Sequence, residues 1–239
     1  MTNSKVIALG IIVLSSLIGF DVKAQESTNI PKISGAMKNV MWKGQLYGTI
    51  HLDTIASKQH LYGLGPVEYL SGEILIFDGI AYKSTVVSAT EMIVTTDYNL
   101  KAPFFVHANI EQWEEHILPD SIQSIQQLEN YLDELTQSAQ RPFMFKMNGV
   151  VKSATIHIVN LPKGSKVNSP EEAHKGKTNY FLKEENVDIL GFFSTEHKSI
   201  LTHHDTYVHL HLITADKKQM GHLDDVVFKQ GTMKIYLPK

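Results

Sequence analysis

The stretch YVHLHLITADKKQMGHLDDVVF, residues 207–228, has the pattern of two β-strands joined by a turn. In its first part aliphatic residues alternate with His209 and His211, and side chains two positions apart lie on the same face of a strand. The aliphatic face consists of Val208, Leu210 and Leu212. We therefore expect the aliphatic face in the core and both imidazoles on the opposite face, where they line a cavity.

A turn-like segment, residues 214–221, separates this strand from His222, which opens a predicted return strand that reaches Phe228. A hairpin of this kind brings His222 beside His209 and His211. Three neutral imidazoles without a fourth protein ligand are typical of a catalytic zinc site, where water or substrate completes the coordination sphere. The pattern alone also fits surface or hydrogen-bonded histidines, so the metal site is one of two interpretations.

Composition sets limits on the class of protein. A chain of 239 residues with 43% hydrophobic and 20% charged residues is typical of globular proteins, and not of collagen, coiled coils or disordered proteins. The net charge is -3 and no run of Lys or Arg occurs, so nothing indicates a nucleic-acid partner or an anionic membrane surface. Cysteine is absent, so any metal ligands must be nitrogen or oxygen donors.

The N-terminal residues resemble a secretory signal. Lys5 precedes an apolar stretch, residues 6–20, which is shorter than the roughly 20 residues that span a bilayer. Val22 and Ala24 suit cleavage by signal peptidase after Ala24. Residues 1–24 are therefore predicted to be a signal peptide, with an uncleaved anchor as the alternative. The mature protein is expected to be exported, periplasmic or secreted, and free of the membrane after cleavage.

Residues 25–36 are polar and aperiodic and are predicted to be a mobile leader, so that order begins near Met37. The first half of the ordered region, residues 37–239, is rich in strand signals. These lie at residues 44–50, 73–77 and 81–87. An Asp78-Gly79 pair between the last two strands is a hairpin signal, because both positions of a type I′ turn favour such residues.

A helix is predicted over residues 120–137, where apolar positions recur at spacings of three and four. Asp120 is the expected N-cap, with Gln123 closing a capping box. We expect this helix to serve packing and to carry no chemistry.

The next segments are predicted to form a hairpin and a loop. Residues 143–147 and 150–159 have strand composition on either side of Asn148-Gly149, a common turn pair. Residues 162–188 are too polar for a core and are expected to be an exposed loop, with a lid over a pocket as the alternative.

Two motifs together resemble the acetolactate decarboxylase family. The hairpin residues look like the metal-binding hairpin of that family, with all three histidines at its spacing. They are His209-Leu210-His211-Leu212-Ile213-Thr214, Asp216, Lys218, Gly221 and His222. Upstream, Gly63-Leu64-Gly65 followed by Gly72-Glu73 is similar to the family's Gly-Leu-Gly…Gly-Glu segment. The resemblance extends more loosely from about Gly48 to Tyr236.

The resemblance implies an α/β (α+β) fold of mixed and antiparallel β-sheets with few helices. It implies Zn²⁺, or another divalent metal, on the C-terminal hairpin, held by His209, His211 and His222. The implied reaction converts acetolactate, or a related small 2-hydroxy-3-oxo acid, to a hydroxyketone such as acetoin, with the metal stabilising the enediolate. Glu73 would deliver the proton, with a surface acid as its alternative reading. The implied partners are a small-molecule substrate and, as in relatives, a second copy of the chain in a homodimer.

Departures from the family pattern leave alternatives open. The family's substrate-binding arginine is matched by His157, an imidazole that cannot reproduce a bidentate clamp. No residue matches the family's C-terminal glutamate, and Pro66 replaces a frequent threonine. Arg141 could supply the missing positive charge, although it could instead belong to an exposed strand edge. Three polar residues before the predicted metal-binding strand could supply hydrogen bonds or proton transfer, although they could instead form a polar turn. Those three residues are His203, His204 and Asp205.

The first alternative function is an exported metal-binding protein of the same fold with lost or altered catalysis. Hydrolysis by zinc-bound hydroxide is a further possibility. The sequence contains no nucleophile-elbow or His-Glu-x-x-His motif that would support it.

Overall fold

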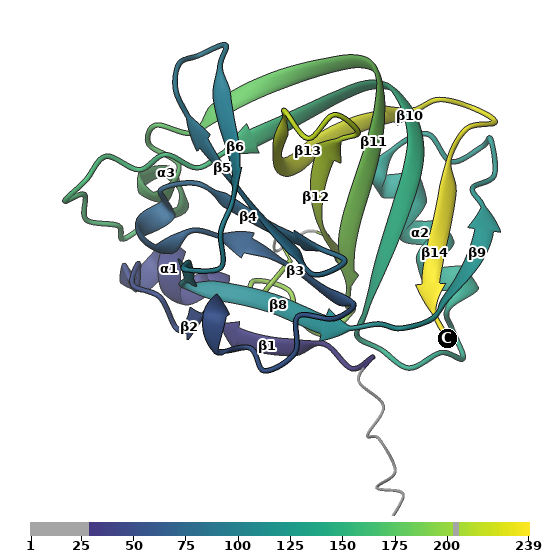
Figure 1. The fold of residues 1–239 in the computed structure, drawn as a ribbon, viewed down its shortest axis with the longest axis horizontal. Coiled ribbons are helices and arrows are strands. Elements are labelled where there is room, and N and C mark those ends of the chain that lie inside the picture. The colour runs from purple at the N-terminus through teal and green to yellow at the C-terminus, as the bar shows by residue number, and fades with distance from the viewer. Residues whose placement is uncertain (1–28, 203–205) are drawn as a thin grey trace, which may run out of the picture.

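The computed structural model describes residues 29–202 and 206–239, and its regular structure consists mainly of two antiparallel β-sheets (Figure 1). The expected sheet-rich fold with few helices is confirmed, and the strand pairings within both sheets are antiparallel. Among the described residues, no helix has the length and apolar character needed to cross a membrane.

The first sheet has six strands, in the spatial order β1 (Lys32–Gly35), β8 (Phe104–Asn109), β3 (Leu61–Pro66), β4 (Glu73–Phe77), β5 (Ile80–Val86) and β6 (Met92–Thr96). The second also has six, in the order β11 (Thr178–Phe193), β12 (Val208–Thr214), β13 (Met220–Phe228), β10 (Phe143–Ile158), β14 (Lys234–Pro238) and β9 (Trp113–Ile117). The remaining elements are the pair β2 (Ile50–His51) and β7 (Lys101–Ala102), the 3-10 turns η1 (Leu52–Thr54) and η2 (Glu68–Leu70), and the helices α1 (Met37–Lys43), α2 (Ile125–Leu135) and α3 (Pro170–Ala173).

The second sheet closes on itself because β10 pairs with β11 as well as with β13 (Figure 1). The ring of β10, β11, β12 and β13 encloses an apolar interior that includes Val208, Leu210 and Leu212. This confirms that the aliphatic face of residues 207–213 joins the core. Ile213, on the opposite face of β12, packs with residues of the first sheet. The histidine face of β12 therefore looks toward the first sheet.

Local sequence signals succeeded in the β4–β5 hairpin and failed after α1. Asp78 and Gly79 have φ values of 47° and 77°, as the predicted turn requires. Residues 44–50, in contrast, are not one strand, because Gly44 ends helix α1 in the left-handed conformation with φ 61°. A Cβ at Gly44 would lie 2.7 Å from the carbonyl oxygen of Val167, so glycine is required there for two reasons.

The expected mobile leader is partly a strand. β1 pairs with β8, with Lys32 opposite His107 and Gly35 opposite Phe104, so regular structure begins before Met37. The edge strand of a sheet offers unpaired N–H and C=O groups to a neighbouring segment. This pairing cannot be predicted from the composition of the polar segment alone. The proposed signal peptide, residues 1–24, lies outside the described residues. Export and the homodimer both remain predictions.

The helix predicted after Asp120 is confirmed as α2, but it begins later than expected. Ser124 is its N-cap and accepts a hydrogen bond from the backbone nitrogen of Gln127 at 3.3 Å. Asp120 instead accepts from the backbone nitrogen of Gly231 at 2.6 Å. Its carboxylate therefore joins two loops and does not cap the helix.

The predicted hairpin around Asn148-Gly149 is wrong, because β10 runs through both residues without turning. Gly149 lies opposite Val187 of β11 and has a φ of 142°, a conformation that favours glycine. A Cβ at this position would approach the carbonyl oxygen of Thr232 to 2.4 Å. Glycine is present because another backbone passes close by, and such close approaches are a common reason for glycine inside a strand.

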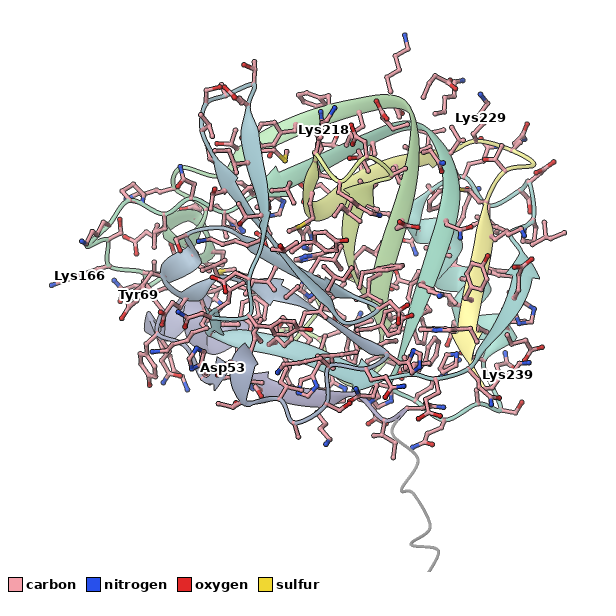
Figure 2. All side chains as sticks on the ribbon, in the orientation of Figure 1. Asp53, Tyr69, Lys166, Lys218, Lys229 and Lys239 are labelled. Atoms are coloured by element: carbon pink, nitrogen blue, oxygen red, sulfur yellow. The ribbon has the colours of Figure 1, made fainter. Side chains whose placement is uncertain are left out.

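The predicted loop over residues 162–188 is only half correct. Its first part, up to residue 177, contains α3 and exposed residues such as Lys166, which projects into solvent in Figure 2. From Thr178 onward the chain is β11, which pairs with β10 along its length. Polar residues are frequent there because one face of the outer part of β11 is exposed.

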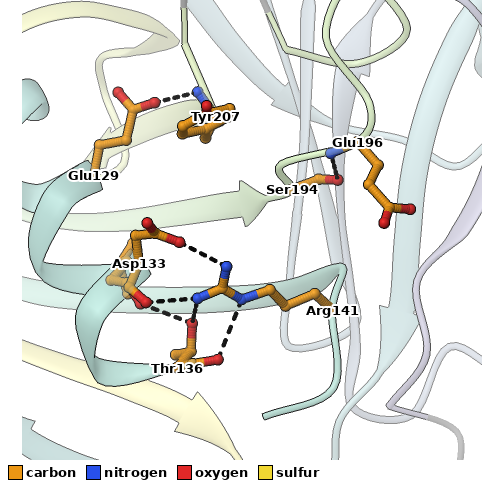
Figure 3. A network of polar contacts seen from close by, with 8 residues as sticks. Glu129, Asp133, Thr136, Arg141, Ser194, Glu196 and Tyr207 are labelled. Atoms are coloured by element: carbon orange, nitrogen blue, oxygen red, sulfur yellow. Dashed lines mark hydrogen bonds and ion pairs between the residues drawn. The ribbon is translucent and has the colours of Figure 1, made fainter. Parts of the chain in front are cut away.

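Arg141 follows α2 and contacts the C-terminal end of that helix (Figure 3). It is not among the residues that line the cavity around His209 and His222. Its guanidinium group donates to the Asp133 carboxylate and to the Asp133 carbonyl oxygen, both at 2.6 Å, and to the Thr136 carbonyl oxygen at 3.2 Å. The last carbonyl groups of a helix lack partners within the helix, and Arg141 donates to two at this end, those of Asp133 and Thr136. Its suggested role in substrate binding is therefore replaced by a structural one.

We expect Arg141→Ala to lower the free energy of unfolding by about 2 kcal/mol, the usual range for charged hydrogen bonds to partly buried groups. Urea denaturation with an unchanged m-value measures the loss. Lys152→Ala, which removes an exposed cation from β10, is the matched control and should change stability by less than about 0.5 kcal/mol. Equal effects of the two substitutions would contradict the assigned role.

Candidate metal centre

Three histidines converge because of the register of the C-terminal strands. His211 of β12 lies directly opposite His222 of β13, and such pairs project from the same face of a sheet. His209 is two positions before His211 and shares that face. Each residue offers one ring nitrogen, and these atoms all lie within 4.8 Å of one another. The predicted triad of His209, His211 and His222 is therefore brought together.

The start of β12 is fixed by helix α2. The Glu129 carboxylate accepts a hydrogen bond from the backbone nitrogen of Tyr207, two residues before His209 (Figure 3). Glu129 is itself buried on the inner face of α2. The helix that was expected to serve packing alone thus also positions the strand that carries His209 and His211.

The environment of His211 favours metal coordination. Burial lowers its pKa well below the ordinary value, with repulsion from His209 and His157 adding to the effect, so the ring is neutral and has a lone pair to offer. Among the described residues no hydrogen bond of normal geometry reaches either ring nitrogen of His211, although the backbone of Ile74 interacts with the ring and offsets part of the lowering of its pKa. Such a buried polar group costs roughly 1–3 kcal/mol. A metal ion would provide the missing partner, so the donor set fits a zinc-type site with an open position.

Glu73 reaches the same point from the opposite sheet. Its Oε2 lies 3.7 Å from Nε2 of His211, and its Oε1 accepts a hydrogen bond from the backbone nitrogen of Val159 at 3.2 Å. Burial raises the pKa of Glu73 well above the ordinary value, and the Val159 hydrogen bond offsets only part of that effect. A carboxyl group in this setting favours its protonated form and can deliver a proton. The alternative reading of Glu73 as a surface acid is wrong, because the residue is buried.

His222 of β13 lies between two paired strands. His211 of β12 is opposite it on one side, and His157 of β10 is opposite it on the other. The centroids of the His157 and His222 rings are 4.7 Å apart. Nδ1 of His157 is 2.8 Å from Oδ1 of Asp224. Oδ2 of Asp224 accepts from Nζ of Lys177 at 3.1 Å. Burial alone would raise the pKa of Asp224, but its contacts with His157 and Lys177 hold that pKa below the ordinary value. The ionised Asp224 fixes the orientation of the His157 ring.

A second group of potential ligands, His157, His222 and Asp224, also meets within 4.8 Å. Both oxygens of Asp224 already have cationic or N–H partners in His157 and Lys177. The first triad is therefore the better candidate for a metal.

Several of these side chains line a small cavity of about 30 Å³. Its polar lining consists of Glu73, His157, His174, His209 and His222. Its apolar lining consists of Met37, Met41, Pro66, Leu70, Phe104 and Val159. The volume corresponds to about one water molecule, so a larger ligand requires side-chain movement.

Two polar residues of this site were missed by sequence reasoning. Asp224 stands two positions after His222, and strand alternation could have placed it near that histidine. His174 lies in the segment interpreted as a loop, and no local pattern distinguishes it. The proposed compensating residues His203, His204 and Asp205 lie outside the described residues.

Comparisons with known proteins agree on one family. A family model described as alpha-acetolactate decarboxylase matches residues 35–238. An alpha-acetolactate decarboxylase of Brevibacillus brevis is 25% identical over 222 residues, which cover 88% of this chain and 74% of that protein.

Solved structures show the same fold. The alpha-acetolactate decarboxylase of Bacillus subtilis strain 168 superposes with a TM-score of 0.71 at 18% identity, over 87% of this chain and 85% of that chain. A Staphylococcus aureus protein of unknown function, similar to alpha-acetolactate decarboxylase, gives a TM-score of 0.68 at 18% identity, over 87% and 84% of the two chains.

Proposed function

The chain belongs to the alpha-acetolactate decarboxylase family, and from that premise we propose that it is a zinc-dependent carboxy-lyase. Its substrate would be acetolactate or a related small 2-hydroxy-3-oxo acid, and its product a hydroxyketone such as acetoin. The observation that carries the proposal is the convergence of His209, His211 and His222 next to the buried carboxyl group of Glu73. Zinc is favoured because three imidazole donors with one open position are typical of catalytic zinc sites.

The reaction needs a place for negative charge and a source for one proton. Loss of CO2 leaves the bonding electron pair on the substrate, where it is shared with the ketone oxygen as an enediolate. His209, His211 and His222 would hold a divalent ion, which when bound would supply Lewis-acid stabilisation of this charge, an effect worth several kcal/mol. Glu73 then donates its proton to the carbon that lost CO2, and Glu73 takes up from solvent the one proton that the overall reaction consumes.

The surroundings of the site support this chemistry. Met37, Met41, Leu70 and Phe104 supply the apolar part of the cavity wall, which limits the access of water and strengthens electrostatic interactions inside it. With Nδ1 of His157 directed to Asp224, its other nitrogen, Nε2, is available to the substrate. A neutral imidazole in this tautomer accepts a hydrogen bond, so His157 would receive the hydroxyl group of the substrate.

The test is release of CO2 and acetoin from racemic acetolactate by purified protein of measured metal content. We expect turnover by the zinc-loaded protein and none after removal of the metal with a chelator, with recovery on adding zinc back. Protein that retains one metal per chain yet releases no CO2 would overturn the decarboxylase assignment. It would then be a metal-binding protein of the same fold.

A further inference from the structure

We propose that Lys146 is a positioning residue, which fixes strand β4 on the second sheet and thereby holds Glu73 against His211. Lys146 belongs to β10, and its ammonium group lies among aromatic rings contributed by both sheets. This inference rests on the proposed function, because Glu73 is the proton donor of the proposed reaction. It adds a residue that acts on the reaction through another residue.

The ammonium group of Lys146 lies at cation–π distance from four aromatic rings. Its nitrogen is 4.8 Å from the ring centroid of Trp113, 5.2 Å from that of Tyr236, 5.5 Å from that of Tyr62 and 5.9 Å from that of Phe77. A cation within about 6 Å of a ring centroid is attracted by the negative face of the ring. The group is therefore held by several rings at once.

The rings belong to both sheets, so the cation joins the sheets. Tyr62 of β3 and Phe77 of β4 come from the first sheet, whereas Trp113 of β9 and Tyr236 of β14 come from the second. The centroids of Tyr62 and Trp113 are 5.0 Å apart with the rings at 84°, a favourable edge-to-face contact between the sheets. We call Lys146 and these four rings the aromatic joint.

The partial burial of Lys146 strengthens the aromatic joint. Burial lowers the pKa of Lys146, and the carboxylates of Asp78 and Asp188 offset part of that effect. A cation that is partly removed from water gains more from an aromatic ring than an exposed one does. An uncharged side chain in place of Lys146 should therefore weaken the contact between the sheets.

Lys146 lies in the same row of paired residues as two histidines of the candidate metal centre. It is opposite Leu190 of β11, which is opposite His211 of β12, and His222 of β13 follows. Residues paired in this way project from one face of a sheet. Leu190 packs with residues of the first sheet, as Lys146 does. The whole row therefore projects toward the first sheet.

Strand β4 meets this row in the matching order. Glu73, Leu75 and Phe77 occupy alternate positions of β4 and project from one face. Glu73 lies 3.7 Å from the ring nitrogen of His211, and Phe77 contacts Lys146. Leu75, between them, belongs to the same apolar cluster as the leucine of the row. The aromatic joint thus fixes one end of β4, and a shift there would change the distance between Glu73 and His211 at the other end.

The experiment compares Lys146→Gln, which removes the charge, with Lys146→Arg, which keeps it. Lys152→Gln is the matched control, because it removes an exposed lysine from the same strand. Metal content is measured for each zinc-loaded protein, together with kcat and KM for acetolactate. Crystal structures of the wild type and the variants give the distance between Oε2 of Glu73 and Nε2 of His211.

We expect Lys146→Gln to lower kcat about tenfold and to lengthen the distance between Glu73 and His211 by about 1 Å, since a displacement of that size can cost up to about a hundredfold in rate. KM should stay within about threefold of wild type. Metal content should not change, because all three histidines belong to β12 and β13. Lys146→Arg should recover most of the loss, since a guanidinium group also binds ring faces. Lys152→Gln should behave as wild type.

A double substitution separates positioning of Glu73 from a general loss of stability. In the Glu73→Gln background, Lys146→Gln should lower kcat by less than about twofold, because the residue that it positions no longer delivers a proton. A full tenfold loss in that background would show that Lys146 acts independently of Glu73, and would overturn the proposal.

An unchanged distance between Glu73 and His211 in Lys146→Gln would also overturn the proposal, as would a loss of kcat that Lys146→Arg does not reduce. Failure of the wild type to release CO2 would overturn the proposed function instead, and the measured distance would still decide whether Lys146 positions Glu73. If Lys146→Gln does not fold, Phe77→Leu takes its place in the same measurements, because it removes a ring of the aromatic joint from β4 itself. Wild-type kcat and distance in that variant would contradict the assigned role.

Discussion

His211→Ala is expected to remove the metal and, with it, all measurable decarboxylation. Binding of a structural zinc through four ligands contributes roughly 10–16 kcal/mol, which is about 3 kcal/mol for each ligand. Loss of one of the three histidines should therefore raise the Kd for the metal at least about a hundredfold. His211 is fully buried, and alanine at this position offers no ligand atom to the metal. Elemental analysis should find about one metal per wild-type chain and less than a tenth of that in the variant.

Thermal unfolding gives an independent readout of the same site. A metal present at about a thousand times its Kd adds roughly 4 kcal/mol, which for a chain of this size is about 10 °C in Tm. A chelator should therefore lower the Tm of wild type by that amount and leave His211→Ala unchanged. His51→Ala, a substitution on β2 outside the cavity, is the control and should keep both metal and chelator sensitivity. Unchanged metal content after replacing all three histidines would refute the site.

Glu73→Gln is expected to lower kcat by a factor between about a hundred and ten thousand while metal content stays at the wild-type level. A positioned general acid contributes an effect of this size. Glutamine has nearly the same shape, and its carbonyl oxygen can still accept the hydrogen bond from Val159. The substitution thus removes the proton and preserves the packing. Steady-state kinetics with acetolactate, together with metal analysis, separates loss of chemistry from loss of zinc.

Glu68→Gln is the matched control for this prediction. Glu68 lies on η2, close to Glu73 in sequence, and its carboxylate accepts a hydrogen bond from the backbone nitrogen of Gly48 without lining the cavity. We expect its kcat to remain within about twofold of wild type. A Glu73→Gln enzyme that retained more than a tenth of wild-type kcat would show that another group delivers the proton.

The sequence alone predicted the chemistry of the site where that chemistry follows from short-range patterns. Alternation along residues 207–213 predicted a strand with one aliphatic face, and the return strand with His222 follows from a turn of ordinary composition. Both features depend only on residues that lie two to fifteen positions apart in the sequence, so they can be predicted without knowledge of the tertiary structure. Glu73 was identified through a resemblance to the family segment, since a single acid in a strand has no local signature.

Local rules gave wrong answers where a distant backbone sets the conformation. Asn148-Gly149 has turn composition, but pairing with β11 and the close approach of Thr232 keep β10 extended through it. Gly44 was interpreted as part of a strand, although it ends α1 against the carbonyl of Val167. In both cases the glycine is required by a contact that no window of sequence contains.

By itself, then, the sequence determined which side chains can hold a metal, because residues on one strand face share a direction whatever surrounds them. The tertiary structure decided what acts with them. Pairing of β10 with β13 brought His157 beside His222, and sheet packing brought Glu73 within 3.7 Å of His211. These are long-range contacts, whose formation depends on the whole chain closing around one core.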